Sequence, residues 1–355
     1  MGQSADTGNP RRLTPDSLLF IKGEMMEISG RTKMICLLGS PVAHSMSPAM
    51  HNEAFQELGL DYRYLAFDVK EGELAGVMDS FRRMGVRGFN LTMPLKTEAV
   101  ALCDRLSPAA EIAGSVNTVV FEDDGTATGH TTDGIGFTES ARQEGVDFRG
   151  QKITLLGTGG AGIAVLVQLA LDGAREISVF ERMGSRFHER TARVVADLNA
   201  RTQCHVTVYD YDDAVMQQQI AESFLLINAT NVGMAPNTDA CVIKDASWLT
   251  ARTPSKDTAA LTARAASSAV EAVSVDMLDD KTDAARSISP APKPLIVADV
   301  IYNPRKTKLL EMAESCGLKS FNGINMLLYQ GAAAFELWTG QKMPVEKIKA
   351  KFFSE

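Results

Sequence analysis

Positive charge is scarce in this chain. Its 355 residues include 36 lysines and arginines against 44 aspartates and glutamates, a formal net charge of −8 at pH 7. Proteins that bind nucleic acid mainly through its phosphates present a surplus of basic side chains. The charge balance therefore argues against nucleic acid as a partner, and the length suits two or three domains.

Long apolar runs are also absent. No stretch is apolar over the ~20 residues that a membrane-spanning helix needs. The N-terminus lacks the apolar core of a secretory signal. A content of 45% hydrophobic and 23% charged residues is ordinary for a globular protein in water. We therefore expect a cytoplasmic protein without a membrane partner, either a monomer or a homodimer.

Cysteine is sparse and scattered. The number is odd, and no Cys-x-x-Cys pair occurs. A disulfide framework or a cysteine-based zinc site is disfavoured, and reduced thiols are the simpler interpretation. The five positions are Cys36, Cys103, Cys204, Cys241 and Cys316.

What the sequence does contain is a regular alternation of strand and helix patterns. Short apolar runs that end near glycine alternate with segments whose apolar residues recur every three or four positions. Strands are predicted at 33–39, 62–69, 86–93, 152–157, 176–181, 205–210, 224–230 and 294–302. Helices are predicted at 48–58, around 74–81, after Pro94, from 133 onward, at 324–338 and, more weakly, near the C-terminus. This alternation predicts an α/β fold with mostly parallel sheets.

Three segments depart from the alternation. Residues 116–130 read as a β-hairpin that turns at Asp124-Gly125. Residues 1–30 are polar without steady periodicity and are predicted to form a tail. Residues 251–293 are rich in Ala, Ser, Thr, Asp and Pro and are predicted to be a surface insertion.

A glycine-rich motif follows the strand predicted at 152–157. The segment "GTGGAG" fits G-x-G-x-x-G between a strand and an apolar helix. Gly157 would allow a tight turn, Gly159 a close approach of a pyrophosphate, and Gly162 close packing of helix on strand. The free N–H groups of the helix N-terminus, including those of Gly160 and Ala161, would favour an anion. The alternative is a glycine-rich turn with a structural role only.

The end of the next strand bears on the choice of cofactor. Glu181 lies 19 residues after Gly162, where an acid usually binds the ribose hydroxyls of NAD. Arg182 and Arg186 follow, and arginine is the residue that suits the 2′-phosphate of NADP. We expect NAD, with use of NADP also open.

Candidate acid–base residues lie at two other strand ends. "NLTMPLK" supplies Asn90, Thr92 and Lys96, and "TTDG" supplies Asp133. A lysine and an aspartate in one cleft can transfer a proton and stabilise each other's charge. Either residue taken alone could be an ordinary solvated side chain. Asn117 could bind a hydroxyl or close the hairpin, and Gln330, inside an apolar helix, needs a polar partner.

The segment "SPVAHSMSPAMH" (40–51) crowds serines and histidines together. A metal site is disfavoured because His44 and His51 are seven residues apart with no further ligand placed beside them. A serine nucleophile is disfavoured because the segment lacks the G-x-S-x-G nucleophile elbow, the sharp turn that exposes such a serine. We expect Ser45 and Ser47 to bind a small anion, although Ser47 could instead be a helix N-cap.

Taken in order, these motifs resemble the shikimate dehydrogenase family, and most of all its branch that oxidises both quinate and shikimate. The family's patterns appear as "GSPVAHSMSP" (39–48), "NLTMPLK" (90–96), "GSVNT" (114–118), "TTDG" (131–134), "GTGGAG" (157–162), "YNPRKTKLL" (302–310) and "MLLYQGA" (326–332). The resemblance runs from about Thr32 to the C-terminus, apart from 251–293. Two departures are Thr131, where the family usually has Asn, and Glu181-Arg-Met183, where NADP-preferring members have Asn-Arg-Thr.

The resemblance implies a split α/β substrate domain (31–133 plus 323–355) and a Rossmann-type NAD(P)-binding domain (134–322). It implies reversible oxidation of shikimate to 3-dehydroshikimate, and also of quinate to 3-dehydroquinate, in aromatic amino acid or quinate metabolism. Lys96 and Asp133 would be the catalytic pair. The substrate would contact Ser45, Ser47, Thr92, Lys96, Asn117, Asp133, Tyr302 and Gln330. The cofactor would contact Gly157, Gly159, Gly160, Ala161, Gly162, Glu181, Arg182, Arg186, Asn231, Val300 and Gly323.

Two other classes of function fit these motifs less well. A metabolite sensor with the same fold would not need both Lys96 and Asp133. A different two-domain dehydrogenase, such as one acting on folates, would not be expected to contain "HSMSP" and "TTDG".

Overall fold

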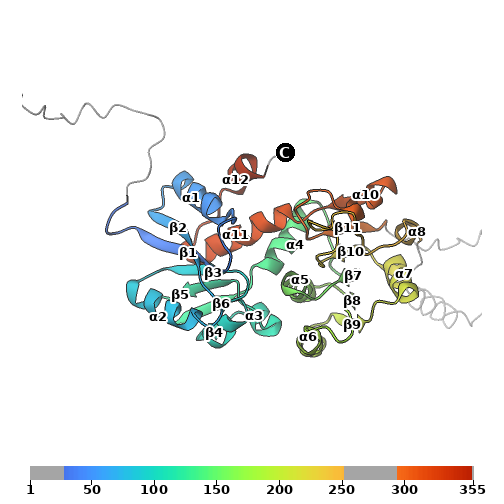
Figure 1. Ribbon diagram of the computed structural model, residues 1–355, viewed down its shortest axis with the longest axis horizontal. Coiled ribbons are helices and arrows are strands. Elements are labelled where there is room, and N and C mark those ends of the chain that lie inside the picture. Colours follow the sequence, from blue (N-terminus) through green and yellow to red (C-terminus); the bar gives the residue numbers. More distant parts are fainter. Residues whose placement is uncertain (1–27, 252–293, 354–355) are drawn as a thin grey trace, which may run out of the picture.

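The computed structural model describes residues 28–251 and 294–353, which form two α/β lobes (Figure 1). Each lobe is built on a six-stranded sheet. Residues 1–27 of the predicted tail and 252–293 of the predicted insertion lie outside the described residues. Within the described ranges, no helix combines the length and the apolarity needed to cross a bilayer.

The first sheet has the strand order β2-β1-β3-β5-β6-β4. Strands β2, β1 and β3 run parallel, whereas β5 is antiparallel to both β3 and β6. The antiparallel pair is the predicted hairpin, and Gly125 in its turn has φ of 81°. The strands are β1 (Lys33–Gly39), β2 (Tyr62–Asp68), β3 (Gly88–Leu91), β4 (Arg105–Leu106), β5 (Thr118–Phe121) and β6 (Ala127–His130).

The helices of this lobe include α1 (Ser47–Glu57), α2 (Leu74–Met84), α3 (Pro108–Ala113) and α12 (Val345–Phe352). The helix predicted after Pro94 was wrong, because the chain forms turns there and then the short 3₁₀ helix η2 (Glu98–Ala101). The N–H of Val116 donates to the carbonyl of Lys96 at 2.8 Å. This contact joins the loop to the start of the hairpin and gives the Lys96 carbonyl a partner outside any helix.

The second sheet is wholly parallel, with the order β9-β8-β7-β10-β11-β12. Counted within the lobe, this is the 3-2-1-4-5-6 order of doubly wound dinucleotide-binding sheets, and the order reverses between β7 and β10. The strands are β7 (Lys152–Leu156), β8 (Glu176–Phe180), β9 (His205–Tyr209), β10 (Leu225–Asn228), β11 (Ile296–Asp299) and β12 (Lys319–Phe321). They confirm the strands predicted from 152 to 302 to within a few residues.

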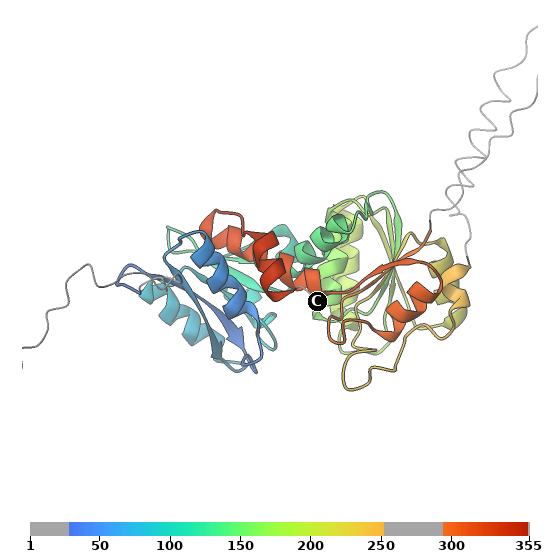
Figure 2. The same ribbon diagram turned by 90° about the horizontal axis from the view of Figure 1, so that it is seen from above.

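Helices cover both faces of this sheet (Figure 2). Strands β7 and β10 are buried along their whole length, as expected for strands covered on two sides. Ile163 and Val167 of α5 pack into one buried cluster with Ile153 and Leu155 of β7. The helices are α5 (Gly160–Leu171), α6 (His188–Arg201), α7 (Asp213–Glu222), α8 (Ser247–Thr250) and α10 (Lys308–Ser315).

Two helices, α4 (Asp133–Gln143) and α11 (Ile324–Thr339), lie between the sheets (Figure 1). Gly134 and Gly136 bring α4 close to its neighbours. A Cβ at Gly134 would lie 2.3 Å from the carbonyl oxygen of Ala164 in α5, and one at Gly136 would lie 2.5 Å from that of Met326 in α11. Helix α4 is therefore in backbone contact with both lobes.

Candidate active site

A cavity of about 500 Å³ opens between the lobes, where β1 and β3 end and α4 and α11 begin. All eight residues predicted to bind substrate line it, together with three predicted to bind cofactor. The first group is Ser45, Ser47, Thr92, Lys96, Asn117, Asp133, Tyr302 and Gln330, and the second is Ala161, Val300 and Gly323.

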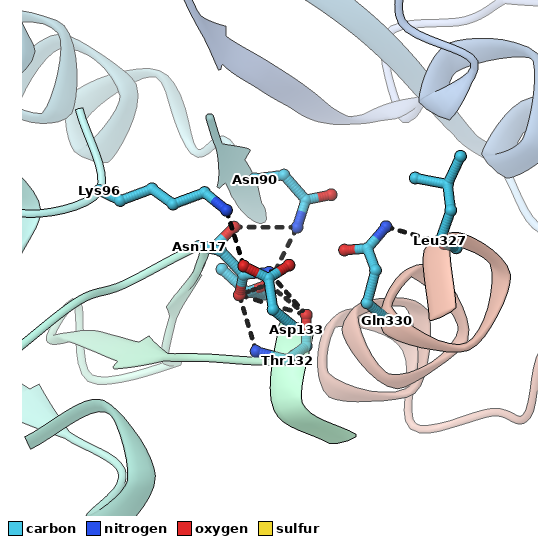
Figure 3. A network of polar contacts seen from close by, with 8 residues as sticks. Asn90, Lys96, Asn117, Thr132, Asp133, Leu327 and Gln330 are labelled. Carbon is cyan, nitrogen blue, oxygen red and sulfur yellow. Dashed lines mark hydrogen bonds and ion pairs between the residues drawn. The ribbon is translucent and has the colours of Figure 1, made fainter. Parts of the chain in front are cut away.

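Lys96 and Asp133 form an ion pair inside this cavity (Figure 3). The Lys96 Nζ atom lies 2.7 Å from Asp133 Oδ2, and the side chains are 24% and 15% exposed. The lysine comes from the loop after β3, whereas the aspartate is the first residue of α4, where the helix dipole favours a negative charge. The pair is shielded from bulk water but open to a ligand in the cavity.

Asn117 fixes the other oxygen of the aspartate. Its Nδ2 donates to Asp133 Oδ1 at 2.8 Å and to Thr132 Oγ1 at 3.0 Å. Its Oδ1 accepts from the Thr132 N–H at 2.8 Å and from Thr118 Oγ1 at 3.0 Å. The buried amide thus has partners on both sides, and it closes the hairpin and orients Asp133 at the same time.

The serines lie at another wall of the cavity. Ser45 Oγ accepts from the Ser47 N–H at 3.2 Å. Helix α1, which is described in full, has no side-chain hydrogen bond at its N-cap, which is Met46. The N-cap alternative for Ser47 was therefore wrong, and Ser45 is the serine that accepts a helix N–H.

Tyr302 and Gln330 line the cavity on the side of the second lobe. Tyr302 is 45% exposed on the loop after β11. Buried Asp299 supports this loop by accepting from the N–H of Ile301 at 3.0 Å and from Thr307 Oγ1 at 2.7 Å. Burial raises the pKa of Asp299 from its usual value. Gln330 extends from α11 toward the Lys96–Asp133 pair, and its Nε2 donates to the Leu327 carbonyl at 3.0 Å (Figure 3).

Asn90, which the sequence points to beside Thr92 and Lys96 but which is not among the predicted substrate contacts, also lines the cavity. It lies at the end of β3, only 4% exposed, and its Nδ2 donates to the carbonyl of Asn117 at 3.1 Å. Its position as the first residue of "NLTMPLK", at a strand end, was the available signal. A buried amide that faces a cavity can form hydrogen bonds with the hydroxyl groups of a ligand.

The glycine loop fits a dinucleotide pyrophosphate. Gly157 has φ of 94°, a left-handed conformation suited to glycine. A Cβ on Gly162 would lie 2.2 Å from the Gly157 carbonyl oxygen, so α5 can begin this close to β7 only with glycine there. By contrast, no described atom lies within 4 Å of a Cβ at Gly159 or Gly160. The N-terminus of α5 therefore presents an open glycine surface to an anion.

Glu181 does not point outward from the end of β8. It is 3% exposed, and its carboxylate accepts from Thr158 Oγ1 and, at 2.6 Å, from Thr191 Oγ1. His188 Nδ1 lies 3.0 Å from its other oxygen. The acid therefore braces Thr158 in the glycine loop from inside, while Arg182 and Arg186 are exposed beside it.

No three His, Cys, Asp or Glu side chains within the described ranges come together as metal ligands. His44 lines the cavity, whereas His51 is fully buried. Asn231 is exposed in the turn after β10, outside the cavity wall.

Comparison with known proteins decides the family. Residues 37–119 match the family model described as the shikimate dehydrogenase substrate binding domain, and residues 323–351 match the shikimate 5′-dehydrogenase C-terminal domain. Shikimate dehydrogenase (NADP(+)) of Listeria monocytogenes is 42% identical over 92% of this chain and 97% of its own length. The chain belongs to the shikimate dehydrogenase family.

Solved structures of shikimate dehydrogenase family members and of a quinate dehydrogenase share the fold. The shikimate 5-dehydrogenase of Listeria monocytogenes, in complex with shikimate and NAD, has a TM-score of 0.77 and 41% identity over 91% of this chain and 97% of that one. The quinate dehydrogenase of Corynebacterium glutamicum, in complex with NAD, has a TM-score of 0.70 and 25% identity over 91% and 99%. The predicted two-lobed α/β fold is confirmed.

Proposed function

We propose that this chain catalyses the reversible NAD(P)-dependent oxidation of shikimate to 3-dehydroshikimate. The observation that carries the proposal is the Lys96–Asp133 pair in a cavity that also holds two serines and three residues of the cofactor side. A sensor could bind the same ligand without a paired acid and base at its reacting carbon. Family membership supports an oxidoreductase.

The cofactor, when bound, supplies or accepts the hydride. During reduction the Lys96 ammonium gives a proton to the carbonyl oxygen, and during oxidation Lys96, having lost that proton to solvent, takes the proton of the substrate hydroxyl as a neutral amine. Asp133, held by Asn117, keeps the lysine amine in place and stabilises its charged form. The apolar walls formed by Leu37, Val42 and Leu91 limit the access of water to the reacting carbon.

We assign substrate binding to residues 31–133 with 323–355, and cofactor binding to 134–322. The first sheet and α11 supply most of the proposed substrate contacts, and the second sheet carries the glycine loop. The cavity lies where these two parts meet.

Replacing Ser45 and Ser47 together with alanine should raise KM for shikimate by about tenfold or more, because a buried anion loses two hydrogen-bond donors. Turnover at saturation should fall less, since neither hydroxyl lies next to the proton-transfer pair. Steady-state kinetics at fixed cofactor measure both constants. A fall in kcat with KM unchanged would place the serines at the reacting carbon instead.

The expectation that the cofactor is NAD is not supported. The expectation of NAD assumed that Glu181 faces the ribose, but its carboxylate is buried against Thr158 and Thr191. The curated relative named above carries NADP(+) in its name. We propose that the chain uses NADP, with Arg182 and Arg186 binding the 2′-phosphate, and that NAD remains usable because neither arginine is needed for it.

Replacing Arg182 and Arg186 with alanine should raise KM for NADP by about tenfold or more, and change KM for NAD by less than about threefold. Arg201→Ala is the matched control, because this exposed arginine at the end of α6 pairs with Glu111 at 3.0 Å, away from the glycine loop. Equal effects on both cofactors would rule out the phosphate assignment. Kinetics with shikimate and quinate, each with both cofactors, also test quinate as a second substrate. Absence of any absorbance change at 340 nm in all four assays would favour a sensor.

A further inference from the structure

A buried tyrosine lies behind the substrate cavity without lining it. Tyr64 is on the edge strand β2, where Leu65 and Phe67 are exposed, but its own side chain points inward and is fully buried. Its hydroxyl donates to Asn90 Oδ1 at 2.7 Å.

These contacts fix the orientation of the Asn90 amide. Its Nδ2 donates to the Asn117 carbonyl at 3.1 Å and to Thr118 Oγ1 at 2.9 Å. A carbonyl can only accept, so the NH₂ group must face Asn117 and the oxygen must face Tyr64. Without the tyrosine hydroxyl, the buried Oδ1 atom would lose the side-chain donor that the described residues provide.

The tyrosine is therefore linked to the proton-transfer pair. The hydrogen bonds run from Tyr64 through Asn90 to Asn117, which orients Asp133. Tyr64 is the fully buried end of this chain of hydrogen bonds.

The ring of Tyr64 is part of a buried aromatic stack. His51 stacks on it with ring centroids 4.5 Å apart and planes within 9°. Phe335 stacks on the same histidine, and neither ring nitrogen of His51 has a hydrogen-bond partner among the described residues. Burial lowers the pKa of His51 to about 3, so the stack is uncharged. Stacking on the neutral His51 ring holds the plane of the Tyr64 ring.

We propose that Tyr64 is a positioning residue for the dehydrogenase reaction, which acts by orienting the Asn90 amide toward the substrate. This inference rests on the proposed function. It predicts that the hydroxyl, rather than the ring, matters for catalysis.

The test compares Tyr64→Phe with the wild-type chain. We expect kcat/KM for shikimate to fall by about tenfold or more, because a small displacement of a substrate-binding group is costly in rate. The dissociation constant of NADPH should change by less than about twofold, since no cofactor residue contacts Tyr64. Tyr62→Phe is the matched control, because Tyr62 lies on the same strand and its ring stacks on Phe55 of the same aromatic cluster, while its hydroxyl is not part of the hydrogen-bond chain through Asn90.

A double-mutant cycle with Asn90→Ala shows whether the tyrosine acts through the amide. Asn90→Ala removes the Oδ1 atom that accepts from the tyrosine hydroxyl. In that background Tyr64→Phe should therefore lower kcat/KM by less than about twofold further. Equal losses in both backgrounds, or a loss of melting temperature with kcat/KM unchanged, would overturn the inference. If wild-type protein itself fails to turn over shikimate, the proposed function fails instead, so the two failures are distinguishable.

Discussion

Lys96→Ala should lower the turnover of shikimate at least about a hundredfold while NADPH still binds, in line with the usual contribution of a general acid–base group. The ammonium group is the one charged donor within 2.7 Å of Asp133 among the described residues. Alanine removes the proton carrier and leaves the carboxylate beside a void. The glycine loop does not depend on this side chain, so cofactor affinity should persist.

Two variants sharpen this experiment. Lys96→Arg keeps a positive charge next to Asp133 but releases a proton far less readily, so it should be almost as slow as the alanine variant. Lys244→Ala removes an exposed lysine that pairs with Asp213 at 2.5 Å and should leave turnover unchanged. Near-normal turnover of Lys96→Ala would remove the lysine from the mechanism, and full activity of Lys96→Arg would show that charge alone suffices.

Gly162→Ala should weaken NADPH binding about tenfold or more and lower the melting temperature by several degrees. The new Cβ would meet the Gly157 carbonyl oxygen at 2.2 Å and its carbonyl carbon at 3.0 Å. These are backbone atoms of the loop that would hold the pyrophosphate, so relief of the clash has to move the loop. Fluorescence titration of NADPH and a thermal melt measure the two effects.

Gly160→Ala is the control for this prediction. No described atom lies within 4 Å of a Cβ at Gly160, so the melting temperature of the free protein should be unchanged. Any loss of NADPH affinity in that variant would then reflect contact with the cofactor itself. Equal stability of both variants would contradict the packing role assigned to Gly162.

Much of the architecture could be predicted from local pattern. The central parallel strands β7 and β10 are buried throughout, and the glycine motif has the spacing that close packing of α5 on β7 requires. The error after Pro94 arose because a contact between distant residues, Val116 to Lys96, decides that segment. Hydrophobic spacing alone carries no information about such a contact.

The site was harder to predict where a residue's role depends on its direction. Glu181 is the expected residue type at the expected strand end, but its carboxylate faces Thr158 and Thr191 rather than the solvent. Tyr64 lies in an alternating strand pattern that indicates packing only. The role of its hydroxyl depends on a hydrogen bond to Asn90, 26 residues later. Side-chain direction follows from tertiary packing, which a single sequence does not display.

The glycines of α4 have a consequence for how the two lobes can move. Because the α4 backbone touches α5 at Gly134 and α11 at Gly136, sliding of one helix past another would bring main-chain atoms into collision. A change in the width of the cavity mouth would therefore have to be a rotation with its axis near these contacts. Asp133 is the first residue of this helix and lies next to these contacts. The aspartate would therefore move little in such a rotation, and the residues of the cavity wall farthest from the axis would move most.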